Sequence, residues 1–116
     1  MPAFSRGDIA AIISYHHPEV IKAISHDRYL DGRDAVRAEL LGTFEKLRLE
    51  CIEQRVENLF FQGDPAVEQS VFTVKDTPKN GSEPFLFKSR ALVVYVRYKG
   101  SPTGWASIRE LLQPVP

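Results

Sequence analysis

The apolar positions at the start of the chain follow a helical period. Isoleucines spaced three and four apart predict a short helix over residues 6–15. A longer stripe with the same spacing runs from Val36 to Leu47 and predicts an amphipathic helix that begins at Arg33. Phe44 is the largest side chain of this stripe, so we expect it to anchor the helix on a sheet.

The remaining segments favour extended structure. Residues 19–25 are rich in β-branched side chains and predict a first strand, which a loop over residues 26–32 connects to the helix. After the helix the apolar period changes to two, and turns rich in Gly, Pro and Asn separate the later strands. These strands are predicted over residues 49–62, 66–76, 85–98 and 105–112. The strand over 85–98 is apolar on both faces at its centre, which predicts a position in the middle of the sheet.

Length and composition indicate one globular α+β domain over residues 1–116. Fifteen basic residues balance fifteen acidic ones, so we expect no field that attracts the phosphates of a nucleic acid. Cys51 is the single cysteine, which leaves no intramolecular disulfide and favours the cytoplasm. No segment has the roughly 20 apolar residues of a membrane helix, and the N-terminus lacks the apolar centre of a signal peptide. We therefore expect a cytoplasmic protein that binds neither nucleic acid nor a membrane.

Several short motifs occur at positions typical of one protein superfamily. They are Gly7-Asp8-Ile9 before a helix, His17-Pro18-Glu19-Val20 at the first strand, Asp31-Gly32-Arg33-Asp34-Ala35-Val36 before the next helix, and Gly104-Trp105 at the last strand. With them, nearly the whole chain resembles the SnoaL-like, ketosteroid-isomerase-like branch of the nuclear-transport-factor-2-like superfamily. The resemblance implies a cystatin-like α+β fold in which a cone-shaped, curved antiparallel or mixed sheet wraps around N-terminal helices. It also implies a pocket in the mouth of the cone and, in many members, dimerisation through the sheet.

The resemblance also locates candidate catalytic residues. In the steroid isomerases a catalytic aspartate lies near the end of the first strand, and that position falls close to Ile24 here. His26 and Asp27 follow it in the loop that the resemblance places at the open end of the cone. A histidine titrates near neutral pH and is suited to general-base catalysis, so these two are the candidate catalytic residues.

Candidate ligand contacts come from side chains that combine an apolar surface with a hydrogen-bonding group. Four residues fit this description: Tyr15, Tyr29, Tyr95 and Trp105. Of these, Tyr15, Tyr29 and Trp105 are predicted to contact a ligand. His16 and His17 are adjacent and precede a proline, which is not the spacing of helical metal ligands. We therefore expect no metal, and because no phosphate loop or dinucleotide fingerprint occurs, we expect no cofactor.

These observations leave three functions open. The first is a small-molecule-binding or accessory domain with an apolar or weakly polar ligand and no dedicated acid–base set. The second is a small isomerase, cyclase or dehydratase that uses His26 or Asp27, and the third is a dimeric interaction module whose pocket is filled by its own side chains. We favour the first and third because no carboxylate occupies the isomerase position. Because helices can cover only one face of the sheet, its apolar outer face predicts a homodimer.

Overall fold

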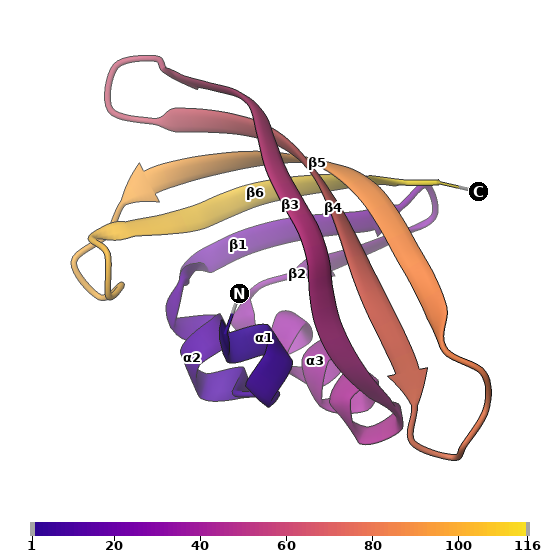
Figure 1. Cartoon of the computed structure of the whole chain (residues 1–116). Coiled ribbons are helices and arrows are strands. Elements are labelled where there is room, and N and C mark those ends of the chain that lie inside the picture. Colours follow the sequence, from indigo (N-terminus) through magenta and orange to yellow (C-terminus); the bar gives the residue numbers. More distant parts are fainter. Residues whose placement is uncertain (1, 116) are drawn as a thin grey trace.

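The computed structural model describes residues 2–115, which form three helices and a six-stranded sheet (Figure 1). In chain order the elements are α1 (Pro2–Arg6), α2 (Ile9–Ser14), β1 (His16–Ser25), β2 (Arg28–Asp31), α3 (Arg33–Lys46), β3 (Leu47–Phe61), β4 (Ala66–Pro78), β5 (Phe85–Arg97) and β6 (Trp105–Pro114). The strands are ordered β2-β1-β6-β5-β4-β3 across the sheet. β1 and β6 run parallel, and all other neighbours are antiparallel. The predicted α+β class with a mixed sheet is therefore confirmed.

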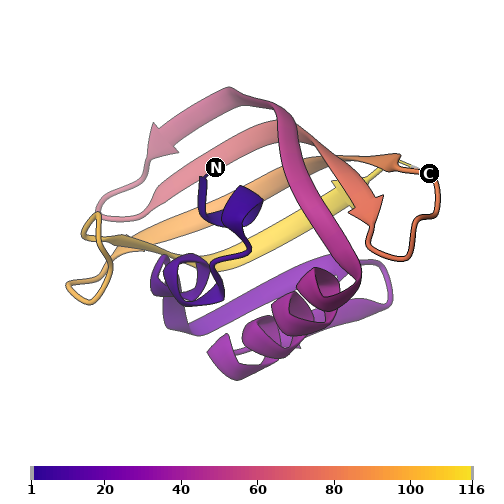
Figure 2. The ribbon, with the colours of Figure 1, turned by 60° about the horizontal axis from the view of Figure 1, so that its bottom comes forward.

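The sheet curves around the helices without closing into a barrel (Figure 2). All three helices lie on its concave side, so its convex side is left uncovered by helices (Figures 1 and 2). The two edges of the sheet are the short β2 and the long β3. Within residues 2–115, no helix is long and apolar enough to cross a membrane.

The hydrophobic core lies between the helices and the β1–β2 end of the sheet. Its buried members are Ile12, Ile13, Val20, Leu30, Val36 and Leu40. Phe44 packs against this cluster from the last turn of α3, and its ring centroid lies 6.2 Å from that of Phe4. The cluster contains no residue of β3–β6, although Ala66, Ala91 and Val93 of those strands are also buried.

The helix predicted over residues 6–15 corresponds to α2, and a further short helix, α1, precedes it across a bend at Gly7. This residue has a φ of 65°, a left-handed conformation that glycine adopts without strain. Asp8 then caps α2, accepting a hydrogen bond from the N–H of Ala11 at 3.1 Å. A Cβ at Gly7 would lie 3.5 Å from the ring of Phe44, so the bend itself packs against α3.

β1 and β2 are more extensive than the sequence pattern predicts. β1 begins at His16 because the carbonyl of Tyr15 accepts a hydrogen bond from the N–H of Ser107 at 3.0 Å, which docks this segment on β6. Residues Arg28–Asp31, predicted as loop, form β2 in an antiparallel hairpin with β1. Leu30 of this strand is buried in the core, so tertiary packing stabilises a strand that the local sequence does not indicate.

β5 lies in the interior of the sheet, as its sequence predicts. It pairs with β4 on one side and with β6 on the other. Successive side chains of a strand point to opposite faces. Ala91 and Val93 are buried on one face, whereas Leu92 on the other face is 40% exposed.

Replacing Phe44 with alanine should destabilise the domain by about 2 to 4 kcal/mol, because a ring packed against the core is lost. Urea denaturation followed by circular dichroism measures the change. Leu41→Ala is the matched control, since Leu41 lies on the same helix and is 55% exposed. It should change the unfolding free energy by less than about 1 kcal/mol. Equal denaturation midpoints for both variants would contradict the core position of Phe44.

Candidate ligand-binding site

Strand register determines which side chains share the concave face. Residues paired directly across neighbouring strands lie on the same face of a sheet. One such row consists of Leu30, Lys22, Glu110, Val93, Glu68 and Leu59. Because Leu30 packs into the core beneath the helices, this row faces the concave side. The next row on that side contains Ser107, Tyr95, Ala66 and Phe61.

A hollow of about 240 Å³ lies on this face, where β3 and β5 end and β4 and β6 begin. Its lining residues are Leu59, Phe61, Ala66, Glu68, Tyr95 and Trp105. Leu59 and Phe61 are 51% and 62% exposed, so the rest of the chain leaves them uncovered. The lining of the hollow is therefore mainly apolar, and Glu68 and Tyr95 are its two members that carry an ionisable group.

Aromatic rings form the rim of the hollow. The rings of Phe61 and Trp105 meet edge to face, with their centroids 6.1 Å apart. The guanidinium carbon of Arg97 lies over the Trp105 ring, 4.5 Å from its centroid, in a cation–π contact. The rim thus presents aromatic surface and one positive charge.

Polar side chains lie deeper on the same face. Lys22 Nζ and Glu110 Oε1 are 3.7 Å apart, and these side chains are only 17% and 16% exposed. Burial, together with the nearby carboxylates of Glu68 and Glu110, raises the pKa of Tyr95 to about 12. The phenol therefore stays protonated at neutral pH and keeps its ability to donate a hydrogen bond.

His16 is a buried titratable residue near these groups. The Nδ1 of His16 lies 2.8 Å from the carbonyl oxygen of Ile12. The guanidinium of Arg33 donates two hydrogen bonds to the backbone carbonyl oxygen of His16, at 2.8 and 2.6 Å. Burial lowers the pKa of His16, and the charges of Lys22 and Arg33 act in the same direction, against the hydrogen bond to Ile12 and the charge of Glu110. A neutral His16 therefore ties the start of β1 to α2 and α3.

The neighbouring residue His17 contacts other groups. The ring centroid of His17 lies 5.1 Å from that of Tyr98, and its Nδ1 accepts a hydrogen bond from the N–H of Glu19 at 3.0 Å. The two histidines are thus engaged in separate contacts. Within residues 2–115, no three His, Cys, Asp or Glu side chains form a cluster that could hold a metal ion.

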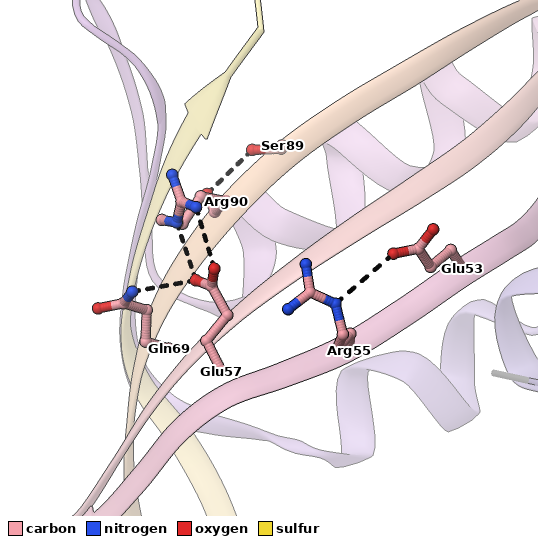
Figure 3. A network of polar contacts seen from close by, with 6 residues as sticks. All are labelled: Glu53, Arg55, Glu57, Gln69, Ser89 and Arg90. Carbon is pink, nitrogen blue, oxygen red and sulfur yellow. Dashed lines mark hydrogen bonds and ion pairs between the residues drawn. The ribbon is translucent and has the colours of Figure 1, made fainter.

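The outer face carries a different set of polar contacts. Glu57 on β3 accepts two hydrogen bonds from Arg90 on β5, at 2.9 and 3.0 Å, and one from Gln69 on β4 at 3.0 Å (Figure 3). These hydrogen bonds, with that of Arg90 the stronger influence, lower the pKa of Glu57 to about 2. A second hollow of about 380 Å³ adjoins this network, and it is lined by Glu57, Asn58, Phe60, Val67, Gln69 and Leu92.

A buried carboxyl group lies at the other end of the sheet. Asp76 pairs with Leu49 and Phe85, and its Oδ1 has no hydrogen-bond partner among the described residues. Burial raises its pKa and so favours the neutral form. Phe85 begins β5 and Tyr95 lies near its end, which separates Asp76 from the concave hollow by about 30 Å of strand.

The predicted catalytic residues lie in the turn between β1 and β2. His26 and Asp27 are exposed, and the Asp27 carboxylate accepts a hydrogen bond from the hydroxyl of Ser25 at 3.0 Å. Because β1 runs parallel to β6, this turn lies toward the end of β6, whereas Trp105 begins β6 about 20 Å away. Neither residue lines the concave hollow, and their catalytic role stays a prediction.

The predicted ligand contacts are distributed over different parts of the molecule. Trp105 lines the concave hollow. Tyr29 is 66% exposed and pairs with Ala23 in a row of the outer face. Tyr15 is 44% exposed and follows the last turn of α2, outside the lining of the hollow. The structure does not bring these aromatic residues into one site.

Two lining residues, Phe61 and Glu68, were not selected from the sequence as ligand contacts, whereas Tyr95 was named there, with Trp105, as a side chain of suitable chemistry. Phe61, Glu68 and Tyr95 come from different strands and meet only through the register of β3, β4 and β5. The alternation of apolar and polar residues along each strand indicates which residues of that strand share a face. It could not select them without the strand pairing, because a shift of one residue exchanges the two faces.

Solved structures with the same architecture are known. A conserved protein from Planctomyces limnophilus superposes with a TM-score of 0.85 and 16% identity, covering 98% of this chain and 88% of that one. A ketosteroid isomerase-like protein from Erwinia carotovora atroseptica gives a TM-score of 0.81 at 20% identity, over 99% of this chain and 87% of that one. A nuclear transport factor 2-like superfamily protein from Salmonella enterica serovar Typhimurium gives 0.78 at 13% identity, over 99% and 82%.

These similarities confirm the fold that the sequence motifs predict. At such low identities the likeness concerns the fold alone. No protein-family model matches the sequence, and a comparison with curated proteins finds no match.

Tyr95 should be the last tyrosine to ionise in a spectrophotometric titration, at about pH 12. An unfolded tyrosine ionises near pH 10, so the folded state holds this proton more tightly. The associated stability is present below about pH 10 and is lost as the pH rises through about 12. Tyr95→Phe should remove the late step, and Tyr29→Phe should leave it in place. A late step that persists in Tyr95→Phe would contradict the burial of this phenol.

Proposed function

Because the chain has the fold of nuclear-transport-factor-2-like proteins, we propose that it is a small-molecule-binding domain whose ligand lies in the concave hollow. The observation that carries the proposal is the open apolar wall on the enclosed side of the sheet. Leu59 and Phe61 there are 51% and 62% exposed. A ligand that covered them would gain about 25 cal/mol per Å² of apolar surface removed from water.

The polar residues of the hollow would orient such a ligand. The protonated phenol of Tyr95 donates a hydrogen bond, and the carboxylate of Glu68 accepts one. An apolar wall with a few convergent polar groups is the usual composition of a small-molecule site. An interaction module with a filled pocket is less well supported, because its own side chains would bury Phe61.

Binding can be tested with Trp105, the only tryptophan of the chain. Compounds with an apolar body and one polar group would be screened by thermal shift, and each hit titrated by Trp105 fluorescence. Phe61→Ala should weaken their binding about tenfold, because it removes an apolar wall. Phe60→Ala is the matched control: the neighbouring ring lies on the outer face and its loss should leave affinity unchanged. Equal losses in the two variants, or no hits, would contradict the proposal.

Acid–base catalysis is a second candidate function, favoured by the carboxylate of Glu68 beside the phenol of Tyr95 in one hollow. Mass spectrometry of each bound compound after incubation separates the two functions. A compound recovered unchanged supports a binding domain, and a chemically altered one supports an enzyme. In the second case Glu68→Gln should stop turnover while the compound still binds.

We also propose that two copies of the chain associate through the outer face of the sheet. Phe60, Leu92 and Leu111 on this face are 50%, 40% and 55% exposed, which is apolar surface that monomers seldom leave in one patch. Two charges beside this patch already pair within one chain, since Arg90 and Glu57 form a bidentate pair. A second copy could therefore cover these two residues without leaving either charge unpaired.

Sedimentation velocity at micromolar concentration should show a dimer, with an interface that buries at least about 1,000 Å². Leu92→Glu should dissociate it, because the new charge would be buried at the centre of the face. Leu59→Glu is the matched control, as Leu59 lies on the concave side and the dimer should persist. A monomeric parent chain under these conditions would contradict the proposed interface.

A further inference from the structure

We propose that the concave hollow selects an organic cation, such as a substituted ammonium group, through its aromatic rings and the carboxylate of Glu68. The inference rests on the proposed binding function and specifies the chemical class of the ligand. It comes from three features of the hollow: an unpaired carboxylate, converging aromatic side chains, and the distribution of charge between its floor and its rim.

Glu68 is a partly buried carboxylate without a counter-charge. In its row it lies between Leu59 and Val93, so its neighbours across the sheet are apolar. Among residues 2–115 Glu68 forms no ion pair. The two other charged residues of its row, Lys22 and Glu110, pair with each other at 3.7 Å. A carboxylate held against apolar surface is stabilised most by a cation close to it.

The aromatic residues of the hollow add a second attraction for a cation. Phe61, Tyr95 and Trp105 all line it, and aromatic faces bind ammonium and guanidinium groups through the negative charge density of their π-systems. The structure contains one such contact, between the guanidinium of Arg97 and the Trp105 ring. The site therefore already binds a positive group at its rim.

The charges of the hollow are separated in space. Arg97 is exposed and pairs with Trp105 at the start of β6, whereas Glu68 lies further in, beside Tyr95. The carboxylates of Glu68 and Glu110 are close enough to raise the pKa of the Tyr95 phenol, and Lys22 balances only one of them. Among the described residues, Glu68 is therefore a negative charge beside the hollow that no cation of the chain balances, and a ligand should carry its positive charge at the end nearest Glu68.

Three ligands of one shape test the charge preference. They are choline, its neutral isostere in which carbon replaces the ammonium nitrogen, and the carboxylate of the same branched skeleton. Each is titrated against the full chain by Trp105 fluorescence. Choline should bind about tenfold more tightly than the neutral isostere, and the carboxylate most weakly.

Variants of opposite charge identify the responsible residues. Glu68→Gln should lower the affinity for choline about tenfold, and Arg97→Gln should raise it severalfold, because a repelling and competing cation is removed. Glu53→Gln is the matched control: it removes an exposed carboxylate of β3 that pairs with Arg55, and choline affinity should not change. Thermal melting of each variant confirms that it is folded.

The possible results separate this inference from the binding function itself. Equal binding of choline and its neutral isostere, with no effect of Glu68→Gln, overturns the cation preference and leaves a binding site for apolar molecules. Tighter binding of the carboxylate, lost in Arg97→Gln, overturns it in favour of an anion site at the rim. If none of the three binds but the screening hits do, the cation class is wrong. If the screening hits also fail to bind, the proposed function is wrong.

Discussion

The parallel pairing of β1 with β6 is the contact on which the rest of the structure depends. It joins the first strand to the last, and it places His16 beside Ser107 although they are far apart in sequence. Through this contact the helices that flank β1 lie over the meander β3–β6 and define its concave side (Figure 2). The buried pair of Lys22 and Glu110 exists only because these two strands are neighbours.

The outer and concave faces of the curved sheet carry different sets of side chains. Phe60 and Phe61 are adjacent in sequence, yet one lines the outer hollow and the other the concave hollow, because successive residues of a strand alternate. On the outer face Arg90 and Glu57 form a bidentate pair (Figure 3), and exposed apolar side chains such as Phe60 and Leu92 lie beside it. On the concave face Glu68 remains without a counter-charge. The first arrangement suits contact with a flat protein surface, and the second suits a small ligand.

Local sequence patterns were sufficient for most of the fold and for little of the site. The stripe containing Phe44 predicted α3, and the apolar centre of β5 predicted its interior position. Trp105 was selected for its chemistry and does line the hollow. His26 and Asp27 were selected because family resemblance placed them at the open end of a cone. The parallel direction of β1 places them at the other end of β6 from Trp105, and their catalytic role stays a prediction.

By itself the sequence determined the α+β class, the order of most elements and the alternation of apolar residues along each strand, because these depend on neighbours in the chain. The pairing of β2 already needed a tertiary contact, the burial of Leu30 in the core. Only the tertiary structure decided that Glu68, Tyr95 and Phe61 share one hollow. Register between strands and curvature of the sheet arise from backbone pairing over long sequence distances, and a shift of one residue would have sent each of these side chains to the opposite face.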